Sequence, residues 1–593
     1  MCNWCARSRI AEALTAGITP GRRRFMAAAA GAALAAQAPA AAQTAPAQTA
    51  PAQTAPAPRA EAIFRNGRIH PMTGAPPLEA LAIGGGRILA AGTAAEAAAL
   101  AGPGTRMVDL GGRALFPGFI DPHNHTVLSS LFDALLVNIG FFRCRTKADA
   151  LAAMRATAAR AAPGAWMAFG FYDNLLQGGD LSMAELDAIS TTSPIFVLYV
   201  NGHVGAGNNL AFQRAGVTRE TGPLPGGGFF GRGADGALNG LIYNEPALLR
   251  FAGQAVPRPD AAAMTRAIEA YAHKAAAAGL TALHEPGTVK PEWIGMLAQL
   301  SNRLPIRLSA SFSTDMIEAS KPFAALGPAH RARHVPDSRL SLYGMKYWGD
   351  GSNQAETAAQ TRPYLNSTAR GTLGYSQAQA VALCTAAKEA GWSILIHSQG
   401  DAAIDQALDA IATAYGANPP TGVNRIEHAT MARPDQIARM KRLGIEASFM
   451  TDFIHLYGAD YRDKLFGAER AAFMCPVGAA ARAGVGHSLH TDNPAAGMPL
   501  NPLRLVQTAV TRRCMVDGSV LGPDITLSVD EALRGITINA ARQMGLGEML
   551  GTLAPGKAAD LTILQGDPYA TDPAKLAEIQ VSETWVAGEK AFG

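Results

Sequence analysis

The stretch Pro117-Gly118-Phe119-Ile120-Asp121-Pro122-His123-Asn124-His125 reads as a short buried strand that ends in two histidines separated by one residue. Residues two apart on a strand point to the same side. His123 and His125 can therefore present two imidazoles to one point, as a metal site requires. A single His-x-His pair is a weak signal, so the interpretation depends on what recurs further along the chain.

The composition is that of a globular protein with more than one domain. Of the 593 residues, 48% are hydrophobic and 17% are charged, which is enough apolar sequence for a large core. The formal net charge of +4 comes from the N-terminal segment, because residues 1–60 hold six arginines and one glutamate and the rest of the chain carries about −1. That balance predicts no basic surface for a nucleic acid.

The N-terminal segment predicts export. Arg22-Arg23-Arg24-Phe25 precedes an apolar, alanine-rich run, and small residues follow before Gln43. A charged start, an apolar middle and a small-residue end are typical of a secretory signal. The Arg-Arg-x-Phe core resembles the twin-arginine export signal, with Gly21 where Ser or Thr is usual. The resemblance implies that residues 1–42 address the protein to the twin-arginine export machinery, and hence to the periplasm or another exported location.

The alternative interpretation of this segment is a disordered alanine-rich tail. Its apolar run is too short to span a bilayer comfortably, so no stable membrane span is expected. A Gln-Thr-Ala-Pro-Ala unit then occurs three times between Gln43 and Ala57. No core can form from such a repeat, and residues 43–60 are predicted to be a semi-extended linker.

The two ends of the remaining chain have a similar pattern of short strands and glycine turns. Residues 61–115 and 549–593 each hold too few strands for an independent sheet. Together they predict one composite β-sandwich domain, with the long middle segment inserted between its two parts.

The middle segment, residues 116–548, predicts a parallel α/β architecture. Strand-like and helix-like runs alternate along it. The expected strands are residues 114–120, 281–284, 306–311, 342–348, 393–396, 425–427, 445–450 and 485–489. Eight strands with intervening helices predict a (β/α)₈ barrel, the TIM-barrel fold. The long gap after the first strand predicts a large insertion at about residues 130–275.

Polar residues follow these strands at the positions where barrel enzymes keep their catalytic groups. The six candidates are His123, His125, Lys346, His397, His428 and Asp492. Each alone has a structural explanation, such as a packed histidine or a turn-starting aspartate. Four imidazoles, one carboxylate and one lysine at separate strand ends together suit one or two Zn²⁺-like ions.

The motifs in this order resemble the amidohydrolase superfamily, and within it amidohydrolase family 3. The matching segments are residues 117–125, 344–352, 397–401, 425–429, 491–494, 537–541 and 551–560. The resemblance covers roughly residues 61–593. It implies a (β/α)₈ barrel with a composite β-sandwich domain, in agreement with the pattern of strands and helices.

The resemblance also implies a role for each candidate. His123 and His125 would bind a buried divalent metal, and His397 and His428 a second one, with zinc the expected ion. Lys346, N-carboxylated by CO₂, would bridge the two metals. Asp492 would bind the first metal and act as the catalytic proton shuttle.

Weaker candidates surround this set. His203, His284, Glu285 and His490 are candidate pocket or supporting residues, and Asp401 is expected to orient the loop after His397. Asn493 follows Asp492 where the family commonly has Trp, which puts the substrate class in doubt.

The sequence therefore predicts an exported metal-dependent hydrolase that cleaves a non-peptide C–N bond of a small-molecule substrate. Lactone or ester hydrolysis, or decarboxylation, on the same scaffold is the first alternative, because a fold does not decide a reaction. A non-catalytic metal-binding exoprotein is the second. A homo-oligomer is left open.

Overall fold

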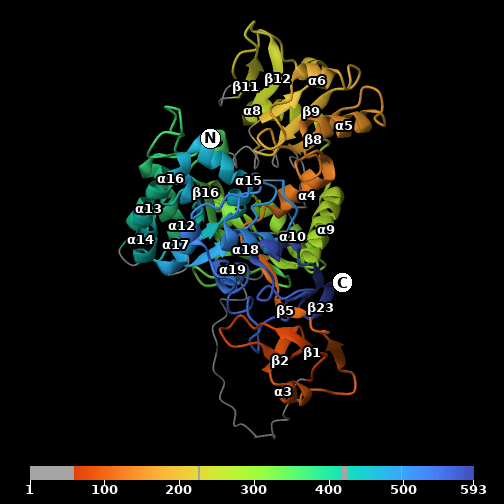
Figure 1. Cartoon of the computed structure of the whole chain (residues 1–593), viewed down its shortest axis with the longest axis vertical. Coiled ribbons are helices and arrows are strands. Elements are labelled where there is room, and N and C mark those ends of the chain that lie inside the picture. The colour runs from red at the N-terminus through yellow and green to blue at the C-terminus, as the bar shows by residue number, and fades with distance from the viewer. Residues whose placement is uncertain (1–58, 203, 225–227, 417–423, 496) are drawn as a thin grey trace, which may run out of the picture.

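The computed structural model describes residues 59–202, 204–224, 228–416, 424–495 and 497–593. The predicted signal and nearly all of the linker lie outside them. The described chain has three parts along its longest axis, with the barrel in the middle, the insertion at one end and the composite β-domain at the other (Figure 1). None of the described helices is both long enough and apolar enough to cross a bilayer.

The predicted α/β barrel is confirmed. Its eight parallel strands lie along one path of a nine-stranded sheet, in which β15 (Arg333–His334) pairs antiparallel with β16. In sheet order the strands are β20 (His487–Leu489), β19 (Glu446–Phe449), β18 (Arg425–His428), β17 (Ile394–Ser398), β16 (Leu340–Trp348), β14 (Arg307–Ser313), β13 (Leu280–Pro286) and β6 (Phe119–Asp121). Each of the eight corresponds to a strand expected from the sequence.

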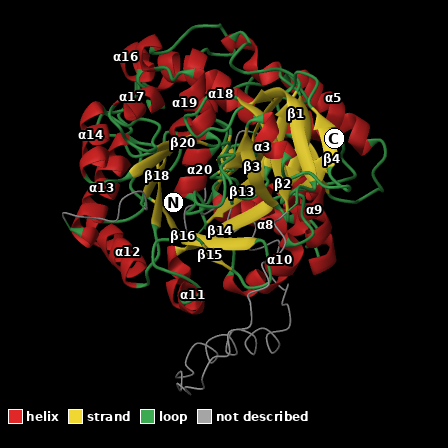
Figure 2. Ribbon diagram, turned by 90° about the horizontal axis from the view of Figure 1, so that it is seen from below, coloured by secondary structure: helices red, strands yellow, loops and turns green. Residues whose placement is uncertain are grey.

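Helices cover the barrel from outside, as Figure 2 shows, so its strands are buried on both faces. All nine residues of β16 are buried. Asp260 caps α9 (Ala261–Ala277) by accepting a hydrogen bond from the Ala263 N–H at 2.7 Å. The other barrel helices include α4 (Thr126–Leu135), α10 (Ile294–Ser301), α11 (Ile317–Ala324), α12 (Gln377–Glu389), α13 (Asp401–Tyr415), α14 (Pro434–Arg442), α17 (Val477–Arg482), α18 (Pro502–Thr511) and α19 (Val529–Gly535).

The first expected strand, residues 114–120, is divided between two sheets. β5 (Ala114–Pro117) belongs to the composite sheet, and β6 begins the barrel. Gly118 lies at the junction, where a Cβ atom would collide with the side chain of Thr281 on β13. Glycine lets the chain pass directly from one sheet to the other, which places the His-x-His segment at the mouth of the barrel.

Strands from both ends of the chain meet in one eight-stranded composite sheet. Its central contact is the antiparallel pairing of β5 with β21 (Leu561–Leu564). Phe64 and Trp585, one from each end, pack edge to face at 5.2 Å between ring centroids in its core. The other strands are β1 (Ala62–Ile69), β2 (Leu78–Gly84), β3 (Arg87–Gly92), β4 (Arg106–Asp109), β22 (Val581–Val586) and β23 (Glu589–Phe592).

The insertion after β6 and α4 folds around its own six-stranded sheet. Its strands are β7 (Val137–Asn138), β8 (Met167–Tyr172), β9 (Ile195–Tyr199), β10 (Val204–Gly207), β11 (Phe229–Arg232) and β12 (Leu238–Tyr243). Its helices are α5 (Lys147–Ala158), α6 (Met183–Asp187), α7 (Asn209–Arg214) and α8 (Glu245–Ala255). The loops that follow β8 and β9 reach back to the mouth of the barrel.

The composite core predicts that the two chain ends stabilise each other. Replacing Trp585, which is 1% exposed, with Ala is expected to cost about 3–5 kcal/mol of unfolding free energy, because it leaves a cavity against Phe64. Denaturant unfolding measures this loss. Phe592→Ala on the neighbouring strand, where the side chain is 37% exposed, is the control and should change little. Equal stability of the two variants would show that the ends do not share a core.

Candidate metal centre

The six predicted ligands come together at the carboxyl end of the barrel strands. His123, His125, Lys346, His397, His428 and Asp492 are each at most 1% exposed. Lys346 lies on β16, His397 on β17 and His428 on β18, while Asp492 follows β20. Their assembly from five separate strand ends is what the sequence pattern predicts for a barrel active site.

Backbone hydrogen bonds join the segments after the first and last barrel strands. The Asp492 N–H donates to the His123 carbonyl, and the His125 N–H donates to the Asn493 carbonyl, each at 3.0 Å. The Asp492 Oδ1 atom consequently lies 3.3 Å from Nε2 of both His123 and His125. Ligand atoms about 3.3 Å apart match the edges of a tetrahedron with metal–ligand bonds of about 2.0–2.1 Å, so these three side chains fit a divalent ion.

His397 and His428 provide a second pair of nitrogens. The His397 Nε2–H donates to the Gly351 carbonyl at 2.9 Å, which leaves Nδ1 as the nitrogen that can bind a metal. Within the described part of the chain, His397 Nδ1 and His428 Nε2 are buried and form no hydrogen bond. The ring centroids are 4.5 Å apart. Two buried ring nitrogens without a hydrogen-bond partner, on rings that pack against each other, are candidate ligands for a cation.

The imidazoles are neutral at neutral pH, as metal ligands must be. Burial lowers the pKa of His123 and His428 well below the usual value, and that of His397 to about 3. The positive charge of Lys346 lowers all three further, so this ammonium group lies among the rings. Gly287, at φ +86°, makes room for it, because a Cβ there would lie 2.7 Å from the Lys346 Cβ.

Buried carboxylates orient the His-x-His pair. Glu427 Oε2 lies 2.7 Å from His123 Nδ1, and Glu285 Oε1 lies 3.2 Å from His125 Nδ1. Burial raises the pKa of Glu285 to about 7. Arg425 pairs with Glu427 at 2.5 Å and donates to the Pro122 carbonyl at 3.0 Å. These contacts direct the Nε2 atom of each histidine to the metal position.

Two ligand-bearing residues have left-handed backbone conformations. His428 has φ +69° and Asp492 has φ +52°. Such values are uncommon for residues other than glycine and cluster at functional sites, where surrounding structure holds them.

The weaker candidates have different positions. The Nε2 atom of His490 lies 3.1 Å from Nδ1 of His428, so His490 supports the ring of a predicted metal ligand. His284 is held inside the barrel by Ser309 and Ser311, away from the cavity. Asp401 accepts hydrogen bonds from the Thr361 N–H at 2.8 Å and from Arg433 at 2.9 Å. His203 lies outside the described residues.

Sequence reasoning gave no role to two carboxylates of the site, Asp350 and Glu427. Asp350 accepts the N–H groups of Gln399 at 3.0 Å and Gly400 at 2.8 Å, so this residue holds the loop after His397, a task expected of Asp401. The sequence does hold a sign of the role of Glu427, because this residue lies two positions after Arg425 on a buried strand. Residues two apart on a strand point to the same side, and opposite charges buried there are expected to form an ion pair.

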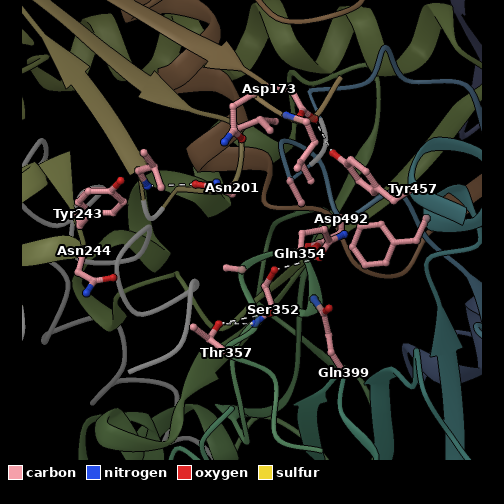
Figure 3. Close-up of a pocket in the computed structure, with 17 residues that line it drawn as sticks. Asp173, Asn201, Tyr243, Asn244, Ser352, Gln354, Thr357, Gln399, Tyr457 and Asp492 are labelled. Atoms are coloured by element: carbon pink, nitrogen blue, oxygen red, sulfur yellow. Dashed lines mark hydrogen bonds between the residues drawn. The ribbon is translucent and has the colours of Figure 1, made fainter. Parts of the chain in front are cut away.

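A cavity of about 280 Å³ lies over the centre, between the insertion and the barrel. Figure 3 shows Asp173, Asn201 and Tyr243 of the insertion across from Asp492 and Gln399 of the barrel. The Tyr457 hydroxyl donates to Asp173 at 2.7 Å and links the two walls. The side chain of Asn493, the residue that departs from the family pattern, instead donates to the Met498 carbonyl at 2.8 Å and braces its loop.

Comparison with known proteins identifies the family of the chain. Residues 106–592 match the amidohydrolase family. An N-substituted formamide deformylase of Arthrobacter pascens is 28% identical, over 86% of this chain and 94% of the relative. The protein LONG AFTER FAR-RED 3 of Arabidopsis thaliana is also 28% identical, over 90% of this chain and 92% of the relative.

A solved structure shares the fold. An uncharacterized metal-dependent hydrolase from Pyrococcus horikoshii OT3 is 22% identical with a TM-score of 0.68, over 86% of this chain and 99% of the other. The chain therefore belongs to the amidohydrolase family. It is a metal-dependent hydrolase that acts on carbon–nitrogen bonds outside peptides.

The carboxylate beside His125 yields a prediction on metal affinity. The two oxygens of Glu285 accept from the Val127 N–H at 2.7 Å and from His125, so Glu285→Gln leaves one of these donors facing an amide N–H₂. We expect zinc affinity to fall roughly 10- to 100-fold. Competitive zinc titration measures it, with Glu446→Gln at the amino end of β19 as the control. An unchanged affinity would mean that Glu285 does not orient the ligand.

Proposed function

We propose that this protein is an exported zinc amidohydrolase that cleaves the amide-type C–N bond of a small molecule. The observation that carries the proposal is the position of Asp492. Its Oδ1 lies 3.3 Å from Nε2 of both His123 and His125, and the residue also lines the cavity above them. One carboxylate can thus contact a metal and a substrate.

The donor set suits two divalent ions. His123, His125 and Asp492 would hold one, and His397 and His428 the other. Bound ions of this kind lower the pKa of water and polarise a carbonyl group. Lys346 would serve both sites as an N-carboxylated side chain, because carboxylation replaces a cation that opposes metal binding with an anion that supports it.

The remaining groups of the cavity act on the substrate. Asp492 would accept a proton from the attacking water at its carboxylate and deliver it to the leaving nitrogen. Gln354 Oε1 accepts from the Ser352 hydroxyl at 2.9 Å, and Gln399 Oε1 accepts from the Asn353 N–H at 3.2 Å. Each glutamine therefore offers its amide N–H₂ to a ligand, which suits an acyl oxygen.

An amide substrate is favoured over an ester for two reasons. The leaving nitrogen of an amide needs a proton, and Asp492 is placed to supply one. The match to the relative from Arthrobacter pascens covers most of both chains, and that relative is named for the removal of a formyl group from a substituted nitrogen. Small N-acyl amines that fit a cavity of about 280 Å³ are the class to test first.

Asp492→Asn tests the mechanism. The substitution keeps an oxygen for the metal and removes the proton acceptor, so we expect metal content and substrate binding to remain while turnover falls roughly 10²- to 10⁴-fold. Metal stoichiometry and turnover on a panel of matched amides and esters are measured together on purified protein. His397→Ala is the comparison and should instead lose metal. If Asp492→Asn keeps turnover within a few-fold of the unmodified enzyme, a group other than Asp492 transfers the proton to the leaving nitrogen.

Export is the second part of the proposal. Arg22-Arg23-Arg24-Phe25 supports passage through the twin-arginine machinery to the periplasm, and this route transports folded proteins, so metal can be loaded before export. We expect Arg22→Lys combined with Arg23→Lys to leave active enzyme in the cytoplasm. Cell fractionation with activity assays measures this, and undiminished periplasmic delivery of the double variant would exclude the twin-arginine route.

A further inference from the structure

Asp173 is a buried carboxylate in the part of the cavity wall that the insertion provides. It directly follows β8, lines the cavity and is 4% exposed. Its Oδ1 atom accepts the N–H groups of Leu175 at 3.0 Å and Leu176 at 3.2 Å, and Oδ2 accepts the Tyr457 hydroxyl at 2.7 Å. A carboxylate has about four positions for hydrogen-bond donors, so one position remains, on Oδ2. Asp173 can therefore take one further donor from a molecule in the cavity.

The protein provides Asp173 with hydrogen bonds but with no counter-charge. In the described part of the chain its three donors are neutral, and no Lys, Arg or His forms an ion pair with it. Burial raises the pKa of Asp173, the three donors lower it, and the nearby carboxylate of Asp460 raises it. A buried charge is ordinarily paired, because its removal from water is costly. A ligand in the cavity can supply the missing positive charge.

The charged groups around the cavity have one sign. Among the described residues that line it, Asp173 and Asp492 are acidic and none is Lys, Arg or His. Asp492 belongs to the metal centre on the barrel, whereas Asp173 lies on the insertion, as Figure 3 shows. The described wall away from the metal centre therefore attracts a cation and repels a carboxylate.

The same cavity offers apolar surface for a carbon chain. Phe453 and Tyr457, both on α15 (Asp452–Asp460), line it with their ring centroids 6.0 Å apart, and Leu175 and Val200 line it as well. Such side chains bury methylene groups, and the face of an aromatic ring also attracts a cation. A substrate with an amide at one end, a short carbon chain and a cation at the other end suits this lining.

We infer that Asp173 is a specificity-determining residue that binds a cationic group of the substrate, such as a primary ammonium, while the amide lies at the metal centre. The inference rests on the proposed function, because the cavity is taken as the binding site of an amide substrate. The substrate class is then an N-acylated diamine or a related amide whose cation lies a short carbon chain from the scissile C–N bond. N-acylated amino acids are disfavoured, because their free carboxylate is repelled by Asp173.

A substitution separates this role from a purely structural one. Asp173 also fixes a turn, since its Oδ1 accepts the N–H groups of Leu175 and Leu176. Asp173→Asn keeps an oxygen for these N–H groups and an amide that can donate to the Tyr457 hydroxyl, but it removes the negative charge. Asp460→Asn is the matched control. Asp460 is close enough to raise the pKa of Asp173, yet it pairs with Lys464 at 2.6 Å and does not line the cavity.

The test compares three matched formamides on zinc-loaded, full-length protein. The probes are the N-formyl derivatives of 1,4-diaminobutane, pentan-1-amine and 4-aminobutanoic acid, which carry an ammonium, a methyl and a carboxylate group at the same end of a similar chain. Calorimetry measures their dissociation constants in the Asp492→Asn background, where turnover is slow. Measurements of kcat/KM are made with Asp492 in place.

We expect the ammonium probe to bind more tightly than the methyl probe and the carboxylate probe to bind most weakly. Asp173→Asn should lower affinity for the ammonium probe roughly 10- to 100-fold and change affinity for the methyl probe by less than about threefold, because only the ammonium forms a charged hydrogen bond with Asp173. Asp460→Asn should leave the preference unchanged.

A methyl or carboxylate probe that binds as tightly as the ammonium probe to protein with Asp173 intact would overturn the inference without any change at this position. Equal losses for the ammonium and methyl probes in folded Asp173→Asn would also overturn it, since Asp173 would then only fix its turn. So would a loss in Asp460→Asn as large as that in Asp173→Asn. Binding is measured without turnover, so a failure of all three probes to be hydrolysed contradicts the proposed function and leaves the charge preference to be observed separately.

Discussion

The structure depends on the seam where the barrel closes. Two backbone hydrogen bonds, from Asp492 to His123 and from His125 to Asn493, join the chain leaving the last strand to the chain leaving the first. Asp121 adds to the seam by accepting the Thr491 hydroxyl at 2.5 Å. The seam holds the Asp492 carboxylate beside the two imidazoles, so closure of the barrel completes this half of the metal centre.

Much of this arrangement could be predicted from the sequence because the signals are local. Short buried runs followed by a polar residue mark strand ends, and the parallel barrel gathers those ends on one face. That pattern predicts His123, His125, Lys346, His397, His428 and Asp492 as one group, and the structure brings these six side chains to the carboxyl end of the barrel. The glycine at position 118 was not recognised as a boundary, because the run that it divides is apolar on both sides and the change of sheet is a tertiary feature.

The supporting contacts could not be predicted because they join residues that are distant in sequence and ordinary in type. Asp350, and not Asp401, braces the loop after His397, and nothing local distinguishes the two carboxylates. The bond between Asp173 and Tyr457 depends on where the insertion docks on the barrel. Contacts of the same kind, such as those of Glu427 with His123 and of the Gly351 carbonyl with His397, decide which nitrogen of a histidine is left for a metal, so the orientation of the ligands depends on packing.

The central claim is that the six strand-end side chains hold divalent ions. Crystals of the protein loaded with zinc, measured by anomalous diffraction at the zinc edge, test it most directly. We predict one ion bound by His123, His125 and Asp492, a second bound by His397 and His428, and a carboxylated Lys346 in contact with both. An ordered zinc elsewhere in the barrel, with these side chains unliganded at saturating metal, would contradict it.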